Sequence, residues 1–308
     1  MTNKLFSQVT IIGLGLIGSS LALALKDKGV AEKVVGLSRS VSTQKYALSA
    51  KIVDEVYGSV EEAVLGADCI VLCTPLGAME GLLIQISQSL HKRPNDRCII
   101  TDAGSSKMFV VEAARKAFSG VLPPFFVPGH PIAGSEKSGI EAGNVQLFLQ
   151  HTVILTPLAE TDSLALKTVS NMWEAVGALV EIMDVTQHDQ YLAVTSHVPH
   201  LLSFAYMYAV SMKKDEALYD YAAGGLRDFT RIAASDPTVW RDIFLSNKQA
   251  VCEMLTDFEA YYAELKEAIL FEKTDTIIKM LGQAKGAREV FSGVLEKRVK
   301  NQTYTLRT

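Results

Sequence analysis

Short apolar runs alternate with helical patterns over the first half of the chain. Four runs rich in β-branched residues have the length of buried strands, at positions 9–12, 34–37, 70–73 and 98–101. Between them, segments such as Ser19–Lys28 and Gly77–Leu90 place apolar residues at helical spacing. This alternation predicts βαβ units and a parallel sheet that is covered by helices on both faces.

A further strand signal closes this part of the chain. The run Thr152–Leu155, which is followed by Thr156 and Pro157, predicts one more strand of the same domain. A helix over positions 163–176 and a short strand over 179–183 are predicted to connect it to the rest. The first half therefore has the α/β pattern of a Rossmann-type domain with a mostly parallel sheet.

The second half has a different pattern, because strand signals nearly vanish from Thr186 onward. Apolar residues recur every three or four positions over Gln187–Met212, Val239–Leu270 and Thr274–Leu295. We therefore predict an all-helical second domain, which divides the chain into domains 1–183 and 184–308. Long helices with broad apolar faces commonly form dimer interfaces, so we expect a homodimer. The polar tail 297–308 is expected to fray.

Composition and charge narrow the classes of function. The 308 residues are 48% hydrophobic and 21% charged, which suffices to bury cores in about two domains. The formal net charge of -4 supplies no basic surface of the kind that neutralises phosphates, so we expect no nucleic-acid partner. No apolar stretch is long and glycine-free enough for a membrane helix. A small-molecule substrate fits these properties best.

Two features bear on the compartment. The apolar run 9–18 after Lys4 can also be taken for a secretory signal, but three glycines interrupt it where a phosphate-binding turn needs them. The four cysteines form no CxxC pair, and Cys69, Cys73 and Cys98 lie inside apolar runs, where a free thiol behaves as a small hydrophobe. We therefore expect reduced, structural cysteines and a cytoplasmic protein.

A glycine-rich turn follows the first predicted strand and opens a helix. Gly13, Gly15 and Gly18 surround Leu16 and Ile17 in the pattern GxGxxG. In this context glycines permit the tight turn, the close approach of the backbone to a pyrophosphate and the packing of helix on strand. The helix N-terminus then meets the pyrophosphate, so the turn predicts a dinucleotide cofactor.

The end of the second strand indicates which dinucleotide binds. An acidic residue there would bind the ribose 2′-hydroxyl of NAD, but the chain has Ser38 and Arg39. A guanidinium can hold a 2′-phosphate through two hydrogen bonds, so the pair favours NADP. The alternative is an NAD enzyme in which Arg39 is a solvated loop residue. Thr74 and Pro75, after the third strand, are assigned to the same cofactor site.

Three groups of polar residues fall where strands are expected to end and loops to begin. An open α/β sheet binds its ligands in the crevice at this edge. The groups are the segments 101–107 and 129–136 and, from the helical half, 197–200 together with 227–231.

The histidines of the helical half also raise the question of a metal site. His197 and His200 stand three residues apart, with His188 and Asp189 upstream. Pro199 disturbs the helical face that two ligands would share, and no cysteine pair or HExxH pattern accompanies them. We therefore expect no metal.

Together these segments resemble the prephenate/arogenate dehydrogenase family over nearly the whole chain, from the glycine turn to about residue 290. The family's GSxK, GHPxAGxExSG, SHxPH and RDxTRIAxSDPxxWRDI stretches occur in this order, the last as Arg227–Ile243. The resemblance implies oxidation and decarboxylation of prephenate or arogenate with a nicotinamide cofactor, on the route to tyrosine. The two acids differ only in a keto or an amino group far from the reacting carbon, so both stay open.

The resemblance also implies the groups at the reacting carbon. His130 would take the proton of the C4 hydroxyl while hydride leaves C4, and an unperturbed histidine pKa of about 6.5 suits that role. We expect His130 in a loop, between Gly129 and Pro131. Ser105, at a loop-to-helix junction, would bind the substrate hydroxyl or the nicotinamide and orient His130. An ordinary helix N-cap is the alternative role of Ser105.

The substrate carries two carboxylates and requires a cationic clamp. Arg231 matches the family position that binds a carboxylate, and a guanidinium fork suits that geometry. Arg227 is the second candidate, with a salt bridge as its alternative role. His200 and Trp240 match positions that line the side-chain end of the substrate, and Glu136 matches one that orders water or gates the pocket.

Two other classes of protein remain as alternatives. One is another two-domain nicotinamide enzyme with a helical second half, such as a β-hydroxyacid dehydrogenase or a pyrroline-carboxylate reductase, which would lack the GHPxAG segment. The other is a dinucleotide-sensing regulator that kept the fold and lost the chemistry. The intact set of Ser105, His130 and Arg231 argues against the regulator.

Overall fold

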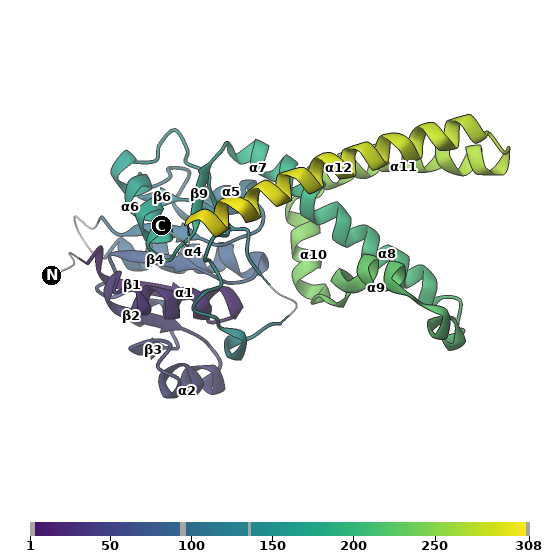
Figure 1. Ribbon diagram of the computed structural model, residues 1–308. Helices are drawn as coiled ribbons and strands as arrows, with labels where there is room; N and C mark the ends of the chain where they lie inside the picture. The colour runs from purple at the N-terminus through teal and green to yellow at the C-terminus, as the bar shows by residue number, and fades with distance from the viewer. Residues whose placement is uncertain (1–3, 93–96, 135–136, 306–308) are drawn as a thin grey trace. The chain divides into compact units, whose positions relative to one another are not determined.

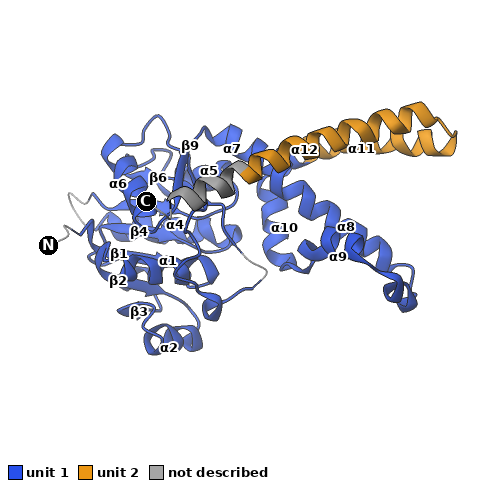
Figure 2. Ribbon diagram, in the orientation of Figure 1, with its two compact units in different colours: residues 1–251 blue, residues 252–308 orange. Residues whose placement is uncertain are grey.

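The computed structural model describes residues 4–92, 97–134 and 137–305 of the chain. The chain forms two compact units, residues 1–251 and residues 252–308 (Figure 2). Both sheets belong to the first unit, and the described part of the second unit is helical.

The first unit is built around a sheet of six parallel strands (Figure 1). Their spatial order is β3-β2-β1-β4-β5-β6, so the strand order reverses between β1 and β4. In an open parallel sheet, ligands bind at the carboxyl ends of the strands beside such a reversal. The strands are β1 (Phe6–Ile12), β2 (Ala31–Leu37), β3 (Glu55–Tyr57), β4 (Cys69–Leu72), β5 (Ile99–Asp102) and β6 (Phe126–Val127).

Helices cover both faces of this sheet, as predicted. One face carries α1 (Leu16–Asp27), α2 (Val41–Ser49) and α6 (Ser163–Ala175). The other carries α3 (Val60–Ala63), α4 (Leu76–Leu90) and α5 (Lys107–Ala117). Adjacent strand residues enter separate apolar cores, so that Val71 belongs to the first core and Leu72 to the second. Because both faces are buried, apolar residues can follow one another directly in a strand, as they do throughout β4.

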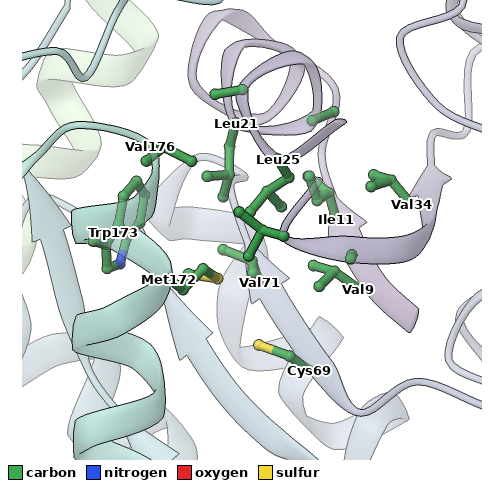
Figure 3. Packing of buried hydrophobic residues seen from close by; sticks show 14 of the residues in the cluster. Val9, Ile11, Leu21, Leu25, Val34, Cys69, Val71, Met172, Trp173 and Val176 are labelled. Carbon is green, nitrogen blue, oxygen red and sulfur yellow. The ribbon is translucent and has the colours of Figure 1, made fainter. Parts of the chain in front are cut away.

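The first of these cores joins segments that are far apart in the sequence (Figure 3). Leu21 and Leu25 of α1 pack with Ile11 of β1, and Met172 and Trp173 of α6 belong to the same cluster. All five side chains are completely buried. This packing fixes α1 on the sheet, and with it the glycine turn at the start of the helix.

The strand predicted at Thr152–Leu155 forms as β8, but it belongs to a second sheet. The order of this sheet is β7-β8-β9, with β7 (Gly129–Pro131) antiparallel and β9 (Leu179–Ile182) parallel to β8. His130 pairs with Ile154 in β7 and so lies in a strand, where the sequence predicted a loop. A three-residue strand that contains glycine and proline is too short to show a strand period.

Helices dominate the first unit after β9, as predicted. The expected helix over 187–212 consists of α7 (Val185–Leu192), a π turn (Ala193–His197) and α8 (Val198–Ser211). After α9 (Gly224–Thr230), the expected helix over 239–270 is divided at Asn247 into α10 (Pro237–Ser246) and α11 (Lys248–Leu270).

The helices α7 to α10 belong to the same compact unit as the large sheet, because α7 packs on α5 and α10 packs on α4. The boundary between the compact units lies at residue 251, far from the division into domains 1–183 and 184–308. That division stays a prediction about a dinucleotide-binding domain and a helical substrate-binding and dimerisation domain.

The second unit contains most of α11 and the helix α12 (Thr274–Thr305). The helix α12 continues past its predicted end at Leu295, so the backbone of the tail that was expected to fray is helical up to Thr305. Large apolar side chains of this unit are exposed, among them Tyr261, Phe271 and Leu281. None of the helices in the described ranges is long and apolar enough to cross a membrane.

Candidate active site

The glycine turn after β1 is shaped by close backbone contacts. Gly13 has a φ of +99°, in the left-handed region that glycine adopts readily. A Cβ atom at Gly18 would lie 2.0 Å from the carbonyl oxygen of Gly13. A Cβ atom at Gly15, by contrast, would meet no protein atom within 4 Å. Packing explains Gly13 and Gly18, whereas the open space beside Gly15 fits the approach of a ligand to the backbone.

The N-terminus of α1 completes this cradle. Gly15 caps the helix without a side-chain hydrogen bond, so the N–H groups of Leu16 and Ile17 are available to an anion. Thr74, after β4, lies against Gly13, and its hydroxyl oxygen is buried without a hydrogen-bond partner among the residues described. Pro75 then caps α4. These features fit a dinucleotide whose pyrophosphate lies at the start of α1.

Ser38 and Arg39 lie directly after β2, beside the glycine turn. The N–H of Gly13 donates to the carbonyl oxygen of Leu37 at 3.1 Å, which joins the two turns. The side-chain amide of Gln44 donates to the carbonyl oxygen of Ser38 at 2.6 Å. Arg39 is exposed, and no described residue pairs with its side chain. Its guanidinium is therefore free to meet a ligand at the edge of the cradle.

A buried ion pair lies at the carboxyl end of β5. The ammonium group of Lys107, the first residue of α5, donates to the Asp102 carboxylate and to the carbonyl oxygen of Gly129, the latter at 2.6 Å. Asp102 also accepts the N–H of Gly129 at 3.1 Å. Both charged side chains are inaccessible to solvent. Burial lowers the pKa of Lys107, and Asp102 opposes that shift. The pair holds Gly129 from two sides, directly before His130.

His130 is 9% exposed, and its Nδ1 lies 2.9 Å from Nε2 of His188 in α7. Burial lowers the pKa of His130 well below 6.5, and charge on His188, Lys107 and His197 lowers it further. The imidazole is therefore neutral at neutral pH and keeps a lone pair. The expected pKa near the ordinary histidine value is thus too high for this environment.

Ser105 lies half-buried in the bend between β5 and α5. Its hydroxyl makes no hydrogen bond within the described chain, so the expected contact with His130 is absent and His188 holds the imidazole instead. The alternative role as a helix cap is not observed either, because Ser106 occupies the N-cap position of α5. The Ser105 hydroxyl is left available to a ligand.

The contacts of His188 and Asp189 were not anticipated from the sequence. The Asp189 carboxylate accepts from Nδ1 of His188 at 2.8 Å and from the backbone N–H groups of Lys107 and Met108 at 2.8 and 2.9 Å. Asp189 therefore caps α5, although 82 residues separate it from Lys107. No local pattern signals a contact over that separation.

His200, Trp240 and Arg231 come together on the helices that follow. The rings of His200 and Trp240 are stacked, with centroids 3.7 Å apart and an angle of 19° between their planes. Burial lowers the pKa of His200, and the nearby charge of Arg231 lowers it further. Arg231 is exposed at the start of a 3-10 turn (Arg231–Ala234) and pairs with no carboxylate in the described residues.

The remaining candidates differ in their surroundings. Arg227 is exposed and donates to the Asp228 carboxylate at 3.0 Å, which is the salt bridge considered as its alternative role. Glu136 lies outside the described residues. Within the described ranges, no group of three or more His, Cys, Asp or Glu side chains is placed to hold a metal ion.

Comparison with known proteins finds similarity over most of the chain. The prephenate dehydrogenase nucleotide-binding domain matches residues 21–182, and the prephenate dehydrogenase dimerization domain matches residues 184–283. A cyclohexadienyl dehydrogenase of Zymomonas mobilis is 36% identical over 92% of this chain and 95% of that protein.

Two solved structures extend the comparison to the fold. A prephenate dehydrogenase from Aquifex aeolicus, in complex with hydroxyphenyl propionate and NAD+, is 34% identical with a TM-score of 0.84, covering 92% of this chain and 98% of that chain. An arogenate dehydrogenase from Synechocystis is 28% identical with a TM-score of 0.76, covering 92% and 99%. The similarity thus includes both the sheets and the helices.

Proposed function

The chain belongs to the prephenate dehydrogenase family, and from this premise we propose how its residues carry out the reaction. It is an NAD(P)-dependent oxidoreductase that oxidises and decarboxylates prephenate, arogenate or both in the biosynthesis of tyrosine. The ring carboxylate leaves as CO2, hydride leaves C4 and the ring becomes aromatic. The chain therefore has to take a proton from the C4 hydroxyl and hold the substrate's carboxylates.

The environment of His130 is the observation that carries the proposed mechanism. One ring nitrogen is held by His188, and the burial that lowers the pKa of His130 keeps the imidazole neutral. The other nitrogen takes the proton of the C4 hydroxyl, and the growing negative charge on that oxygen assists the departure of hydride. Ser105, whose hydroxyl has no partner in the described chain, hydrogen-bonds the same substrate oxygen.

The carboxylate-binding end of the site is formed by the helical residues. Arg231 holds a substrate carboxylate through two parallel hydrogen bonds, a geometry that guanidinium groups favour. The absence of a paired carboxylate among the described residues supports this role over one for Arg227. His200 and Trp240 line the side-chain end of the substrate, and Glu136 orders water or gates the pocket.

A nicotinamide cofactor, when bound, would supply the acceptor for the hydride. Gly13, Gly15 and Gly18, with the N–H groups of Leu16 and Ile17, bind the pyrophosphate, while Thr74 and Pro75 border the cofactor along β4. NADP is the preferred cofactor. Ser38 and Arg39 support this preference, because they place a free guanidinium and no carboxylate at the end of β2.

The enzyme acts as a homodimer in the cytoplasm. The match to a dimerization domain and the exposed apolar side chains of the second unit support the dimer. None of the four cysteines forms a disulfide within the described residues, which supports a reducing compartment. In functional terms, residues 1–183 bind the dinucleotide, and residues 184–308 bind substrate and form the dimer.

Steady-state kinetics with both acids and both cofactors tests the proposed function. We expect reduced nicotinamide and CO2 to form in equal amounts with at least one acid, and a higher kcat/KM for NADP than for NAD. If neither acid reduces either cofactor, the proposed reaction is wrong. If NAD is used at least as well as NADP, only the role given to Ser38 and Arg39 is wrong.

A further inference from the structure

The imidazole of His130 is one end of a buried chain of hydrogen bonds. Its Nδ1 lies 2.9 Å from Nε2 of His188, and Nδ1 of His188 lies 2.8 Å from a carboxylate oxygen of Asp189. All three residues are buried, with exposed fractions of 9%, 0% and 6%. Each of the two contacts requires one donor and one acceptor, so the protons along the chain have to follow one consistent order.

Asp189 determines that order because an ionised carboxylate can only accept hydrogen bonds. Although burial raises the pKa of Asp189, hydrogen bonds from His188, Lys107 and Met108 lower it overall, so the group is ionised at neutral pH. Nδ1 of His188 therefore carries the proton, and its Nε2 has a lone pair. That lone pair accepts from Nδ1–H of His130, which leaves Nε2 of His130 without a proton.

Asp189 is itself fixed from several directions. Its two oxygens accept from the first two backbone N–H groups of α5, a helix of 11 residues, and from the hydroxyl of Ser106 at 3.4 Å. Its carbonyl oxygen accepts from the side-chain amide of Asn247 at 2.8 Å. If the carboxylate rotated away from Nδ1 of His188, it would lose its hydrogen bonds to the N-terminus of α5. The carboxylate therefore stays in place and keeps the proton of His188 on Nδ1.

We propose that Asp189 and His188 are positioning residues, which fix the tautomer of His130 so that the base is presented at Nε2. This inference rests on the proposed role of His130 as the base. When Nε2 takes the substrate proton, the positive charge on His130 is stabilised through two hydrogen bonds in series, because Nδ1–H of His130 donates to His188 and Nδ1–H of His188 donates to the Asp189 carboxylate. The array of His130, His188 and Asp189 therefore both orients the base and stabilises its protonated form.

Charged groups of both signs face this array from the elements packed around it. Burial lowers the pKa of His130, and Lys107 of α5 and His197 of the π turn lower it further. Burial also lowers the pKa of His188, while Asp189 and Asp102 oppose that shift. Loss of the Asp189 charge removes an interaction that favours protonation of the array. We expect the pH profile of kcat/KM to fall on its acid side, and we call this fall the acid limb. Without the Asp189 charge, this acid limb should move to lower pH.

The first experiment compares D189N with D184N. Asp184 caps α7 by accepting from Thr186 N–H at 2.7 Å and is exposed, so D184N makes the same chemical change in a helix-capping side chain that has no hydrogen bond to His130 or His188 among the described residues. D189N should lower kcat by about 10²-fold or more, since an amide cannot satisfy every donor around Asp189. Its acid limb should move to lower pH, while the Kd for cofactor stays within about twofold. D184N should match the parent in kcat, in the acid limb and in the Kd for cofactor.

The proposal would be overturned if D189N and D184N lowered kcat equally. It would also be overturned if the acid limb of D189N coincided with that of the parent. Because Asp189 also caps α5, D189N can lose stability, so a second measurement uses the parent enzyme. In the parent labelled with 15N at histidine, His130 and His188 should both be protonated at Nδ1 and bare at Nε2 at neutral pH. A His130 protonated at Nε2 would overturn the proposal. This spectrum needs no turnover, so it separates failure of the array from failure of the proposed reaction.

Discussion

The two ends of the candidate site are built in opposite ways. At the reacting end, Asp102, Lys107, His130, His188 and Asp189 are all buried and are joined to one another or to the backbone by hydrogen bonds. At the carboxylate-binding end, Arg227 and Arg231 are exposed, and His200 and Trp240 are half-buried.

The difference follows from what each end has to do. A base must be held in one tautomer before the substrate arrives, and buried charges that hold it are tolerated only when each is paired. A clamp for a carboxylate needs a cation that has no partner before the substrate binds. Burial of an unpaired charge costs free energy, so such a cation has to be solvated, as an exposed guanidinium is. Changes at the reacting end should therefore act on kcat, and changes at the clamp should act on KM.

The largest effect is expected from His130→Asn. Loss of a positioned general base should lower kcat by about 10²–10⁴, while cofactor affinity is kept because His130 lies outside the glycine cradle. Steady-state kinetics and a cofactor titration measure the two quantities. The control is His151→Asn, which alters an exposed histidine just before β8. If His130→Asn keeps the parent's kcat, another group, with His200 as the first candidate, takes the proton.

Arg231→Ala tests the other end of the comparison. Removal of one partner of a charged hydrogen-bonded pair costs roughly 2–5 kcal/mol, which should appear mainly as a higher substrate KM. Arg227→Ala is the matched control, because Arg227 already pairs with Asp228. A KM for Arg231→Ala within about twofold of the parent value, with a large rise for Arg227→Ala, would move the clamp to Arg227.

Arg39→Asp should have a smaller effect, confined to the choice of cofactor. A carboxylate repels a 2′-phosphate and can accept from a 2′-hydroxyl, so the ratio of kcat/KM for NADP to that for NAD should fall by about tenfold or more. Lys45→Asp makes the same charge reversal at another exposed position, in α2, and should leave the ratio unchanged. An unchanged ratio in Arg39→Asp would contradict the preference for NADP.

The last effect concerns stability at acid pH and not catalysis. Burial lowers the pKa of His197 to about 4, so the folded protein keeps this group neutral where the unfolded chain, with a pKa of about 6.5, takes up a proton. Stability should therefore fall as pH decreases from about 6.5 toward 4, by up to about 1.4 kcal/mol per pH unit from His197. Urea unfolding at two pH values in this window measures the change. His197→Gln should lose less stability than the parent, and an equal loss would remove His197 as a cause.

The large sheet could be predicted because each of its longer strands is a separate apolar run. Val9–Ile12 and Ile70–Leu72 are buried on both faces, and such strands carry their signal in composition. The second sheet could not be assigned, because the run Thr152–Leu155 shows that a strand exists but not which strand it pairs with. The three residues of β7 show no period at all.

Candidate site residues could be proposed from the sequence where a local motif carries the chemistry. The glycine turn, His130 and Arg231 all lie in such motifs. The proposed roles of His188 and Asp189 depend on contacts with β7 and α5, which the sequence does not encode locally. The motif that contains Ser105 also contains Lys107, but only the fold reveals that Lys107 and Asp102 hold Gly129.

The central claim is that a neutral, buried His130 takes the proton of the substrate hydroxyl, and the pH dependence of kcat/KM tests it most directly. Burial and the charge of its neighbours lower the pKa of His130, so activity should be lost on acidification with an apparent pKa below 6.5. His130→Asn should lack this acid limb. A parent limb above 6.5, or an Asn variant that keeps both the limb and the parent's rate, would contradict the claim.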